Sequence, residues 1–192
     1  MMTRLRYLGL KWRVMASLVF ERRDAALALL RQLLAEFPGD PYALASIAHL
    51  HGQAGRRADA IATMERLLAL HPADGAHWFN YGFLLEADER WEDAEAAFRK
   101  ALELRPDLDR AWYGLGLVLI RLRRFDEAVS ALKRNTQLQP MSPYGWYQLA
   151  RVHVDRHEPE EARKIIRHLK RFEPKVAAQL ERETGLLVPD AS

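Results

Sequence analysis

The stretch that decides the fold is residues 75–108, GAHWFNYGFLLEADERWEDAEAAFRKALELRPDL. Its first half carries apolar or small residues at i, i+3, i+4 and i+7, the spacing of one face of an α-helix; these are Trp78, Tyr81, Gly82 and Leu85. After a polar break, small and aromatic residues keep a helical spacing until a proline stops the second helix; these are Ala94, Phe98, Ala101 and Pro106. Neither helix could bury its apolar face alone. We therefore expect an antiparallel pair in which Phe98 fills the seam.

The same pattern recurs every 34 residues over about residues 41–174, without insertion or deletion. The full copies begin at Pro41, Gly75, Asp109 and Pro143. A helix–turn–helix unit of this length and composition resembles the tetratricopeptide repeat (TPR) family, and the resemblance covers about residues 41–174. It implies an all-α fold, a right-handed solenoid of TPR-like helical hairpins.

The sequence predicts a single solenoid domain over residues 1–192 with one degenerate repeat at its N-terminus. The predicted segments are the basic degenerate repeat 1–40, the full repeats 41–74, 75–108, 109–142 and 143–176, and a capping helix at 175–186. In the degenerate repeat, the second helix falls on the 34-residue lattice. Its first helix fits best with a turn two residues shorter than elsewhere, which would direct four residues toward the core; these are Trp12, Met15, Ala16 and Val19.

Composition limits the possible functions. The chain has no cysteine, which excludes disulfides, thiolate metal sites and a cysteine nucleophile and suits a reducing cytosol. Its basic residues are nearly all arginine, a composition typical of a GC-rich bacterial genome. No apolar run approaches the roughly 20 residues that span a bilayer. We expect a cytoplasmic protein.

The net charge of +3 is unevenly distributed. Residues 1–23 carry six basic side chains against Glu21 alone, so the remainder of the chain is slightly acidic. A general nucleic-acid surface is therefore not implied. The basic N-terminal helix also contains Tyr7, Leu8 and Trp12, which leaves open an alternative in which it docks on a membrane surface or an integral protein.

Catalytic, metal and cofactor signals are weak. His153 and His157 stand at i, i+4, but no third ligand is evident, so we predict no metal site. Gly114 and Gly116 lie in the middle of a predicted helix with no preceding strand, which excludes a dinucleotide-binding loop. We predict no cofactor and no enzymatic activity.

A second stripe on each first helix is not needed to close the repeats. It recurs at i, i+3, i+7 and i+10 and is mostly aromatic and aliphatic, with arginines at intervals. The resemblance implies that this stripe lines a concave groove in which peptides bind. Aromatic and arginine side chains are common at interaction hot spots. The predicted groove residues are Tyr42, His49, Phe79, Asn80, Phe83, Arg110, Tyr113, Leu117, Arg121, Tyr144, Tyr147 and Arg151.

Some members of the resembled family clamp a carboxylate at the C-terminus of a chaperone with five polar residues. Asn80 and Arg110 match that pattern here, whereas Ala45, His49 and Gly114 do not. We therefore expect no carboxylate clamp.

These observations predict a non-enzymatic adaptor or scaffold that binds a partner protein and serves assembly of a larger complex. The expected partner is an extended or helical peptide segment with apolar and acidic groups. The first alternative is a peripheral membrane-associated assembly factor that docks through residues 1–23. An RNA-binding repeat protein is a weaker alternative, because basic residues on the second helices lack stacking aromatic partners.

Overall fold

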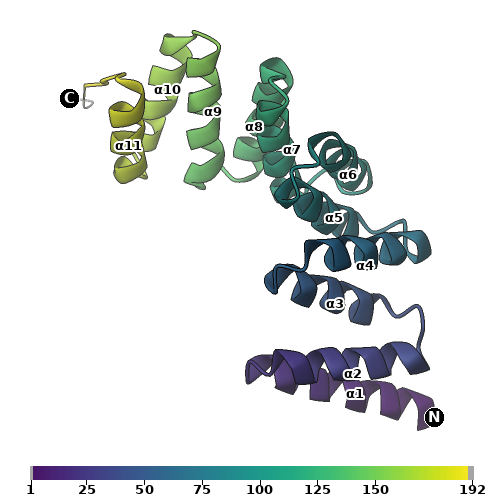
Figure 1. Ribbon diagram of the computed structural model, residues 1–192. Coiled ribbons are helices and arrows are strands. Elements are labelled where there is room, and N and C mark those ends of the chain that lie inside the picture. Colours follow the sequence, from purple (N-terminus) through teal and green to yellow (C-terminus); the bar gives the residue numbers. More distant parts are fainter. Residues whose placement is uncertain (1, 190–192) are drawn as a thin grey trace. The chain divides into compact units, whose positions relative to one another are not determined.

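The computed structural model describes residues 2–189, in which every regular element is an α-helix. Met1 and residues 190–192 lie outside the described residues. Figure 1 labels the helices in chain order. Their bounds are α1 (Met2–Val19), α2 (Arg23–Glu36), α3 (Pro41–Gln53), α4 (Arg57–Leu70), α5 (Gly75–Ala87), α6 (Trp91–Leu104), α7 (Asp109–Arg121), α8 (Phe125–Leu138), α9 (Pro143–Asp155), α10 (Pro159–Lys170) and α11 (Pro174–Thr184).

First and second helices alternate along the chain with the 34-residue period of the sequence. Helices α3, α5, α7 and α9 begin at Pro41, Gly75, Asp109 and Pro143, the first residues of the four full sequence repeats. Each of them is followed, after a short turn, by a second helix, and a proline follows the end of that second helix within four residues. The predicted all-α fold of repeated helical hairpins with a final capping helix is therefore confirmed.

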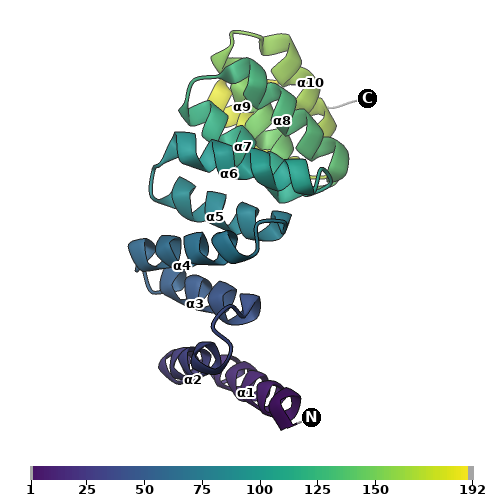
Figure 2. The same cartoon turned by 90° about the vertical axis from the view of Figure 1, so that its right-hand side faces the viewer.

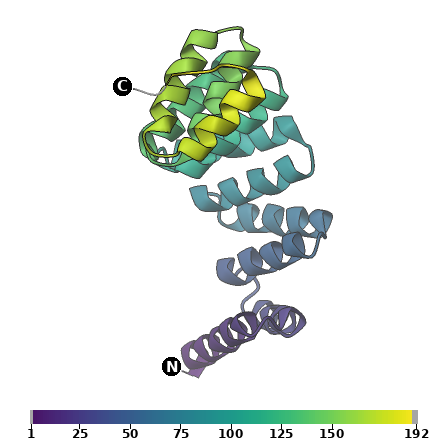
Figure 3. The same ribbon diagram turned by 90° about the vertical axis from the view of Figure 1, so that its left-hand side faces the viewer.

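The described residues form two compact units, one ending at Asp88 and the other beginning at Glu89. In the first unit, each helix from α1 to α5 packs on the next, and Figure 2 shows α3 and α4 lying side by side. In the second unit, α6 to α10 pack in the same consecutive way, and α11 packs on both α9 and α10 (Figure 3). Each unit is thus a stack of neighbouring helices that bury apolar side chains between them.

One residue with a positive φ angle lies in the turn within every repeat. These residues are Glu21 (φ 54°), Gly55 (φ 73°), Glu89 (φ 60°), Arg123 (φ 61°) and His157 (φ 60°). They are spaced by the 34-residue period, and the first belongs to the degenerate repeat. The left-handed conformation lets the chain reverse direction within a few residues. The predicted shortened turn in the first repeat is therefore wrong.

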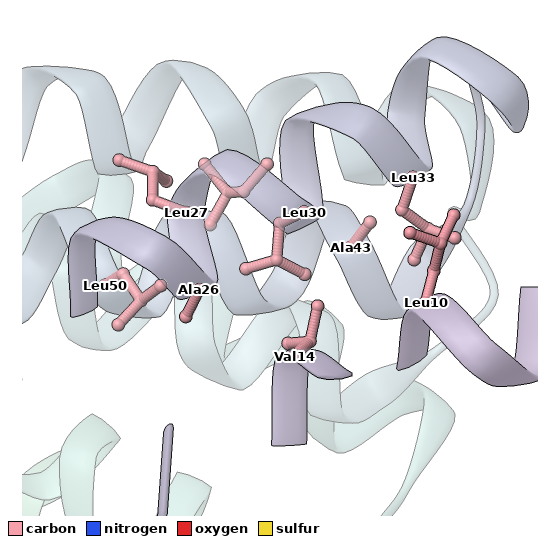
Figure 4. Close-up of a cluster of buried hydrophobic side chains, with 9 residues drawn as sticks. Leu10, Val14, Ala26, Leu27, Leu30, Leu33, Ala43 and Leu50 are labelled. Atoms are coloured by element: carbon pink, nitrogen blue, oxygen red, sulfur yellow. The ribbon is translucent and has the colours of Figure 1, made fainter. Parts of the chain in front are cut away.

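The first repeat consequently buries a different face of α1 from the predicted one. The four residues expected to face the core, Trp12, Met15, Ala16 and Val19, are all exposed. Leu10 and Val14 are buried instead, in a cluster with side chains of α2 and α3 (Figure 4).

The correct register places Leu10 and Val14 one full period before Leu44 and Ala48. The intermediate apolar position, filled by Ile47 in the next repeat, holds Arg13 in α1. This charged residue interrupts the expected apolar pattern, and the nearby Trp12 imitates the tryptophan found at the start of later repeats. Because of these two features, the sequence alone did not indicate how α1 aligns with the later repeats.

A repeated hydrogen bond ties three first helices, α5, α7 and α9, to the loop that precedes each of them. The indole Nε1–H of Trp78 donates to the carbonyl oxygen of Pro72 at 2.8 Å. Trp112 and Trp146 donate in the same way to the carbonyls of Pro106 and Pro140, each at 2.9 Å. The bond satisfies a carbonyl left without a helical partner and fixes the entry of the next helix. The partly buried tryptophans therefore combine packing with a polar contact.

Phe98 of α6 is a fully buried aromatic side chain that packs on α7. A Cβ atom placed on Gly114 would lie 2.6 Å from the ring atom Cζ of Phe98. The ring thus occupies the space that any side chain at position 114 would need. The seam predicted for Phe98 lies within the hairpin of residues 75–108, whereas the contact seen here is with the following helix, α7.

A buried polar side chain, Asn135 of α8, lies between α7 and α9. Its Nδ2 donates to the carbonyl oxygen of Asp109 at 2.9 Å, which gives the buried amide a partner at the start of α7. A Cβ atom on Gly145 of α9 would approach Asn135 Oδ1 to 2.1 Å. The glycine is therefore required by the asparagine, which here hydrogen-bonds within the helix interface.

The C-terminal helix α11 ends in a left-handed glycine. Gly185 has φ 70° and its N–H donates to the carbonyl of Glu181 at 2.9 Å. Beyond it, Val188 is buried, and its N–H donates to the Glu181 carboxylate at 2.8 Å. The ammonium of Lys170 in α10 donates to the Val188 carbonyl at 2.5 Å. These contacts fix the segment after α11 against α10.

Candidate functional site

The first unit contains a cleft of about 290 Å³ between α3 and α5. Three of the predicted groove residues, His49, Asn80 and Phe83, line it together. Phe83 is 57% exposed, which leaves a large apolar surface in contact with solvent. The complete lining is Ala45, Ala48, His49, Gly52, Gln53, Met64, Asn80, Phe83 and Leu84.

Small residues make room for this cleft. Ala45, Ala48 and Gly52 of α3 line the cleft with little or no side chain, and a Cβ on Gly52 would come within 3.3 Å of Leu84 Cδ2. The imidazole of His49 shares a hydrogen bond of 2.9 Å with the side-chain amide of Gln53 one turn later. The result is an apolar floor with a histidine, two amides and an exposed phenyl ring around it.

Two other predicted groove residues of the first unit lie outside this lining. Tyr42 packs against the buried cluster of α1 and α2, and the Lys11 ammonium lies 4.4 Å from the centre of its ring. Burial raises the pKa of the Tyr42 hydroxyl. Phe79 is half-buried on α5 and does not line the cleft.

The second unit contains a cleft of about 460 Å³ bordered by α7, α9 and α11. Three predicted groove residues, Tyr113, Tyr144 and Tyr147, line it together, and Tyr144 is 70% exposed. The complete lining is Tyr113, Pro143, Tyr144, Tyr147, Gln148, Glu173, Val176 and Gln179. Three phenol rings and two amides give a surface that can hold an apolar group and hydrogen-bond the backbone beside it.

A chain of polar contacts orders one side of this second cleft. The Tyr147 hydroxyl donates to a carboxylate oxygen of Glu183 at 2.5 Å, and Arg151 Nη1 lies 3.5 Å from the same hydroxyl. The Arg151 guanidinium also lies 5.8 Å from the centre of the Tyr147 ring. Burial, followed by the hydrogen bond to Glu183, raises the pKa of Tyr147. The ring of Tyr147 is thereby tied to α11.

The Glu183 carboxylate is expected to make the second unit sensitive to acid. Its pKa is lowered by the hydrogen bond from Tyr147 and then by that from Gln179. A group with a lowered folded pKa stabilises the fold above its unfolded pKa of about 4.3, and the effect is lost as the pH falls through the folded pKa. Glu183→Gln should therefore lose less thermal stability than wild type between about pH 5 and pH 3. Thermal melts at several pH values measure the difference.

Tyr147→Phe provides the matched variant, because it removes the donor and keeps the ring. Like Glu183→Gln, it should reduce the loss of thermal stability that the wild type shows as the pH falls. A Tyr147→Phe protein with the full wild-type acid response would show that this hydrogen bond is not the cause.

The remaining predicted groove residues, all in the second unit, lie outside the second cleft. Arg121 lies at the end of α7 with its guanidinium 5.7 Å from the centre of the Trp91 ring. Leu117 is half-buried, and Arg110 is exposed at the start of α7. The structure thus brings together the tyrosines of α7 and α9 and leaves these three residues on other parts of the surface.

Sequence reasoning missed the contribution of α11 to the second cleft. Val176 and Gln179 line it although the helix was predicted only as a cap, and Glu173, the residue before α11, lines it as well. A signal was present, because Val176, Gln179 and Glu183 stand at i, i+3 and i+7 and so share one face of α11. In the first unit, Gln53 was missed although it follows His49 at i+4.

The two histidines considered for metal binding have separate roles. His153 is buried and its Nδ1 lies 2.7 Å from a carboxylate oxygen of Glu158, whereas His157 is exposed in a turn with φ 60°. The hydrogen bond with His153 lowers the pKa of Glu158. Within the described residues, no three histidine, cysteine or acidic side chains are grouped as a metal site would require.

Several basic residues on or next to the second helices are paired with carboxylates. Arg124 pairs with Glu95 at 2.6 Å and with Glu127 at 2.7 Å, and Arg99 bridges the same two acids at 2.8 Å each. Arg163 and Lys164 pair with acidic residues one turn earlier in α10. Paired charges of this kind do not form the continuous cationic strip that RNA binding uses.

Comparison with known proteins agrees with the repeat pattern. A family model described as tetratricopeptide repeat matches residues 45–109 and 84–143, together about half of the chain. No curated protein sequence matches the chain.

Solved structures resemble the whole fold. The crystal structure of MamA has a TM-score of 0.77 at 19% sequence identity, over 97% of this chain and 98% of that one. YrrB, described as a TPR protein with an unusual peptide-binding site, has a TM-score of 0.77 at 18% identity, over 88% of each chain. The pilF protein of Pseudomonas aeruginosa has a TM-score of 0.76 at 20% identity, over all of this chain and 96% of that one. At these identities the likeness is one of fold.

Proposed function

Because the chain belongs to the tetratricopeptide repeat family, we propose that it is a non-enzymatic adaptor that holds a segment of a partner protein on its first helices. The observation that carries the proposal is a pair of clefts, one in each unit, each with a largely exposed aromatic ring beside it. Phe83 and Tyr144 are 57% and 70% exposed, and neither closes a repeat. The peptide-binding site described for YrrB, a protein of the same fold, supports the proposal.

The clefts favour a particular kind of segment. Apolar side chains of the partner would enter the two clefts, because burying them against Phe83 and the tyrosines removes apolar surface from water. His49, Asn80, Gln148 and Gln179 would hydrogen-bond the backbone of an extended or helical peptide.

An acidic group on the partner would pair with Arg110 or Arg151, both exposed on first helices of the second unit. Glu173 is the one carboxylate in the lining of the second cleft, and it would repel an acidic side chain placed directly in that cleft. We therefore propose that acidic groups of the partner lie to the side of the apolar anchors. Such an adaptor would serve assembly of a larger complex in the cytoplasm, which the cysteine-free composition suits.

The proposal is tested by affinity capture with the double variant Phe83→Ser/Tyr144→Ser. Both side chains are largely exposed, so the substitutions should leave the fold unchanged while removing the apolar surface at both clefts. We expect partners captured by the wild type to be lost or to bind at least about tenfold more weakly, since each buried aromatic anchor contributes about 2 kcal/mol or more. Binding of an identified partner is then measured with the purified proteins.

The matched control is Leu70→Ser/Met141→Ser, which removes two apolar side chains of similar exposure (51% and 68%) outside both clefts. It should bind partners as the wild type does. Equal binding by the cleft variant and the wild type, with circular dichroism unchanged, would contradict the proposal.

A further inference from the structure

Helix α1 carries a large exposed apolar surface that no described part of the chain covers. Among the described residues, eleven large hydrophobic side chains are exposed, and six of them lie between residues 5 and 20. These six are Leu5 (65%), Leu8 (45%), Trp12 (71%), Met15 (47%), Val19 (77%) and Phe20 (73%). Scattered single residues of this kind are normal on protein surfaces, but a concentration on one helix marks an interaction site.

The exposed residues form a stripe along the helix. Leu5, Leu8, Trp12, Met15 and Val19 are spaced at alternating intervals of three and four residues, so their side chains share one face. The buried residues Leu10 and Val14 lie on the opposite side, against α2 and α3 (Figure 4). Helix α1 therefore has two apolar faces, one used by the fold and one not. We call the second the outer stripe of α1.

Basic side chains border the outer stripe on both sides. With 3.6 residues per turn, Arg4 and Lys11 lie between the stripe and the core face on one side, and Arg6 and Arg13 lie on the other. The segment from Met2 to Val19 contains no aspartate or glutamate. Within the part of the chain that the structure describes, the one carboxylate paired with these four cations is that of Glu36 on α2, 2.9 Å from Arg6. The stripe is thus an apolar surface with a cationic border.

This charge pattern identifies the occupant. A second copy of α1 would place cationic borders against each other in either orientation, without an acid on the helix to compensate them. An anionic lipid surface instead accepts apolar side chains between its acyl chains and basic ones among its headgroups. We propose that the outer stripe of α1 is a membrane-surface site that binds bilayers rich in anionic phospholipid.

The geometry describes how the helix would lie. The axis of α1 runs parallel to the membrane, and Leu8, Trp12 and Met15 enter the boundary between headgroups and acyl chains. Arg4 and Arg13 extend along the two sides of the helix to the phosphates, as long basic side chains do at interfaces. The contacts that hold α1 to the fold lie outside the stripe and persist: the Tyr7 hydroxyl donates to Asp40 at 2.9 Å, and Arg6 remains paired with Glu36. The proposed site is separate from both clefts.

The test is flotation of the purified full chain with large unilamellar vesicles of phosphatidylcholine, prepared with or without phosphatidylglycerol. We expect binding to the vesicles that contain phosphatidylglycerol, and a decrease in binding as the salt concentration rises. Trp12→Ser/Met15→Ser should weaken the partition coefficient at least about tenfold, because it removes apolar surface from the stripe. Arg4→Gln/Arg13→Gln should weaken it about tenfold or more, because each basic residue near an anionic surface contributes separately.

Matched controls separate this effect from general loss of surface or charge. Leu70→Ser/Met141→Ser removes exposed apolar residues elsewhere, and Arg31→Gln/Arg57→Gln removes two exposed cations from α2 and α4. Both controls should bind vesicles as the wild type does, and circular dichroism should show every variant folded.

Three results would overturn the proposal. The first is no binding of the wild type to vesicles of either composition. The second is equal binding by the stripe variants and the wild type. The third is a dimer, seen by sedimentation without lipid, that Trp12→Ser/Met15→Ser dissociates, which would assign the stripe to a second copy of the chain.

Discussion

Phe98→Ala is expected to lower the free energy of unfolding by about 3–5 kcal/mol, because it removes a fully buried phenyl ring and leaves a cavity between α6 and α7. Urea denaturation followed by circular dichroism measures this loss. Phe83→Ala is the matched control, since it removes the same ring from a side chain that is 57% exposed. The control should cost less than about 1 kcal/mol.

Gly114, which faces the Phe98 ring, allows a second test of this prediction. In the wild type, Gly114→Ala should be destabilising by about 1–3 kcal/mol, because its methyl group would lie 2.6 Å from the Phe98 ring. In the Phe98→Ala background the same methyl enters the vacated space, and alanine improves helix propensity by about 1 kcal/mol. The effect of Gly114→Ala should therefore change sign between the two backgrounds. Equal effects in both would show that the ring and the glycine are not coupled.

The second large effect is expected at Gly145. Gly145→Ala should lower the free energy of unfolding by about 2–4 kcal/mol, because the new methyl displaces the side chain of Asn135 and the displaced amide loses its bond to Asp109. Asn135→Ala alone should cost about 1–3 kcal/mol, since the Asp109 carbonyl loses its donor. Thermal and urea unfolding of the three variants and the wild type complete the cycle.

The double variant Asn135→Ala/Gly145→Ala decides whether steric conflict is the cause. With the amide absent, the alanine at position 145 has room, and the double variant should be at least as stable as Asn135→Ala. If the two single losses simply added, the glycine would be needed for a reason other than the asparagine.

The repeats could be predicted from sequence because each helix of the full repeats has one periodic apolar face and a proline follows each second helix. Tryptophan or leucine near the start of each first helix, and alanine or glycine where helices pack closely, recur every 34 residues. Assigning one helical hairpin therefore assigned the others. The same regularity failed in α1, because Arg13 occupies an apolar lattice position and the helix has two apolar faces. A pattern that appears spread around a helix can therefore consist of two separate faces with different partners.

The candidate site could be predicted only in part. Whether a residue lines a cleft depends on side chains of adjacent helices, which the 34-residue repeat does not specify. Tyr113, Tyr144 and Tyr147 come together as the stripe predicted, and so do His49, Asn80 and Phe83. Tyr42 does not line the first cleft, and the Lys11 ammonium of the atypical first helix lies 4.4 Å from the centre of its ring. Arg121 lies near the indole of Trp91. Such pairings depend on how far a side chain extends toward a neighbouring helix, and the spacing of residues within one helix does not determine that.

The order in which the helices contact one another has a consequence for folding. Within each unit, the main packing contacts join helices that are one or two positions apart along the chain. Low contact order of this kind correlates with fast folding, because only short loops must close before contacts form. A hairpin that emerges during synthesis can therefore pack on the preceding one at once, without waiting for distant sequence. Folding is expected to start at any well-packed hairpin and to spread to its neighbours.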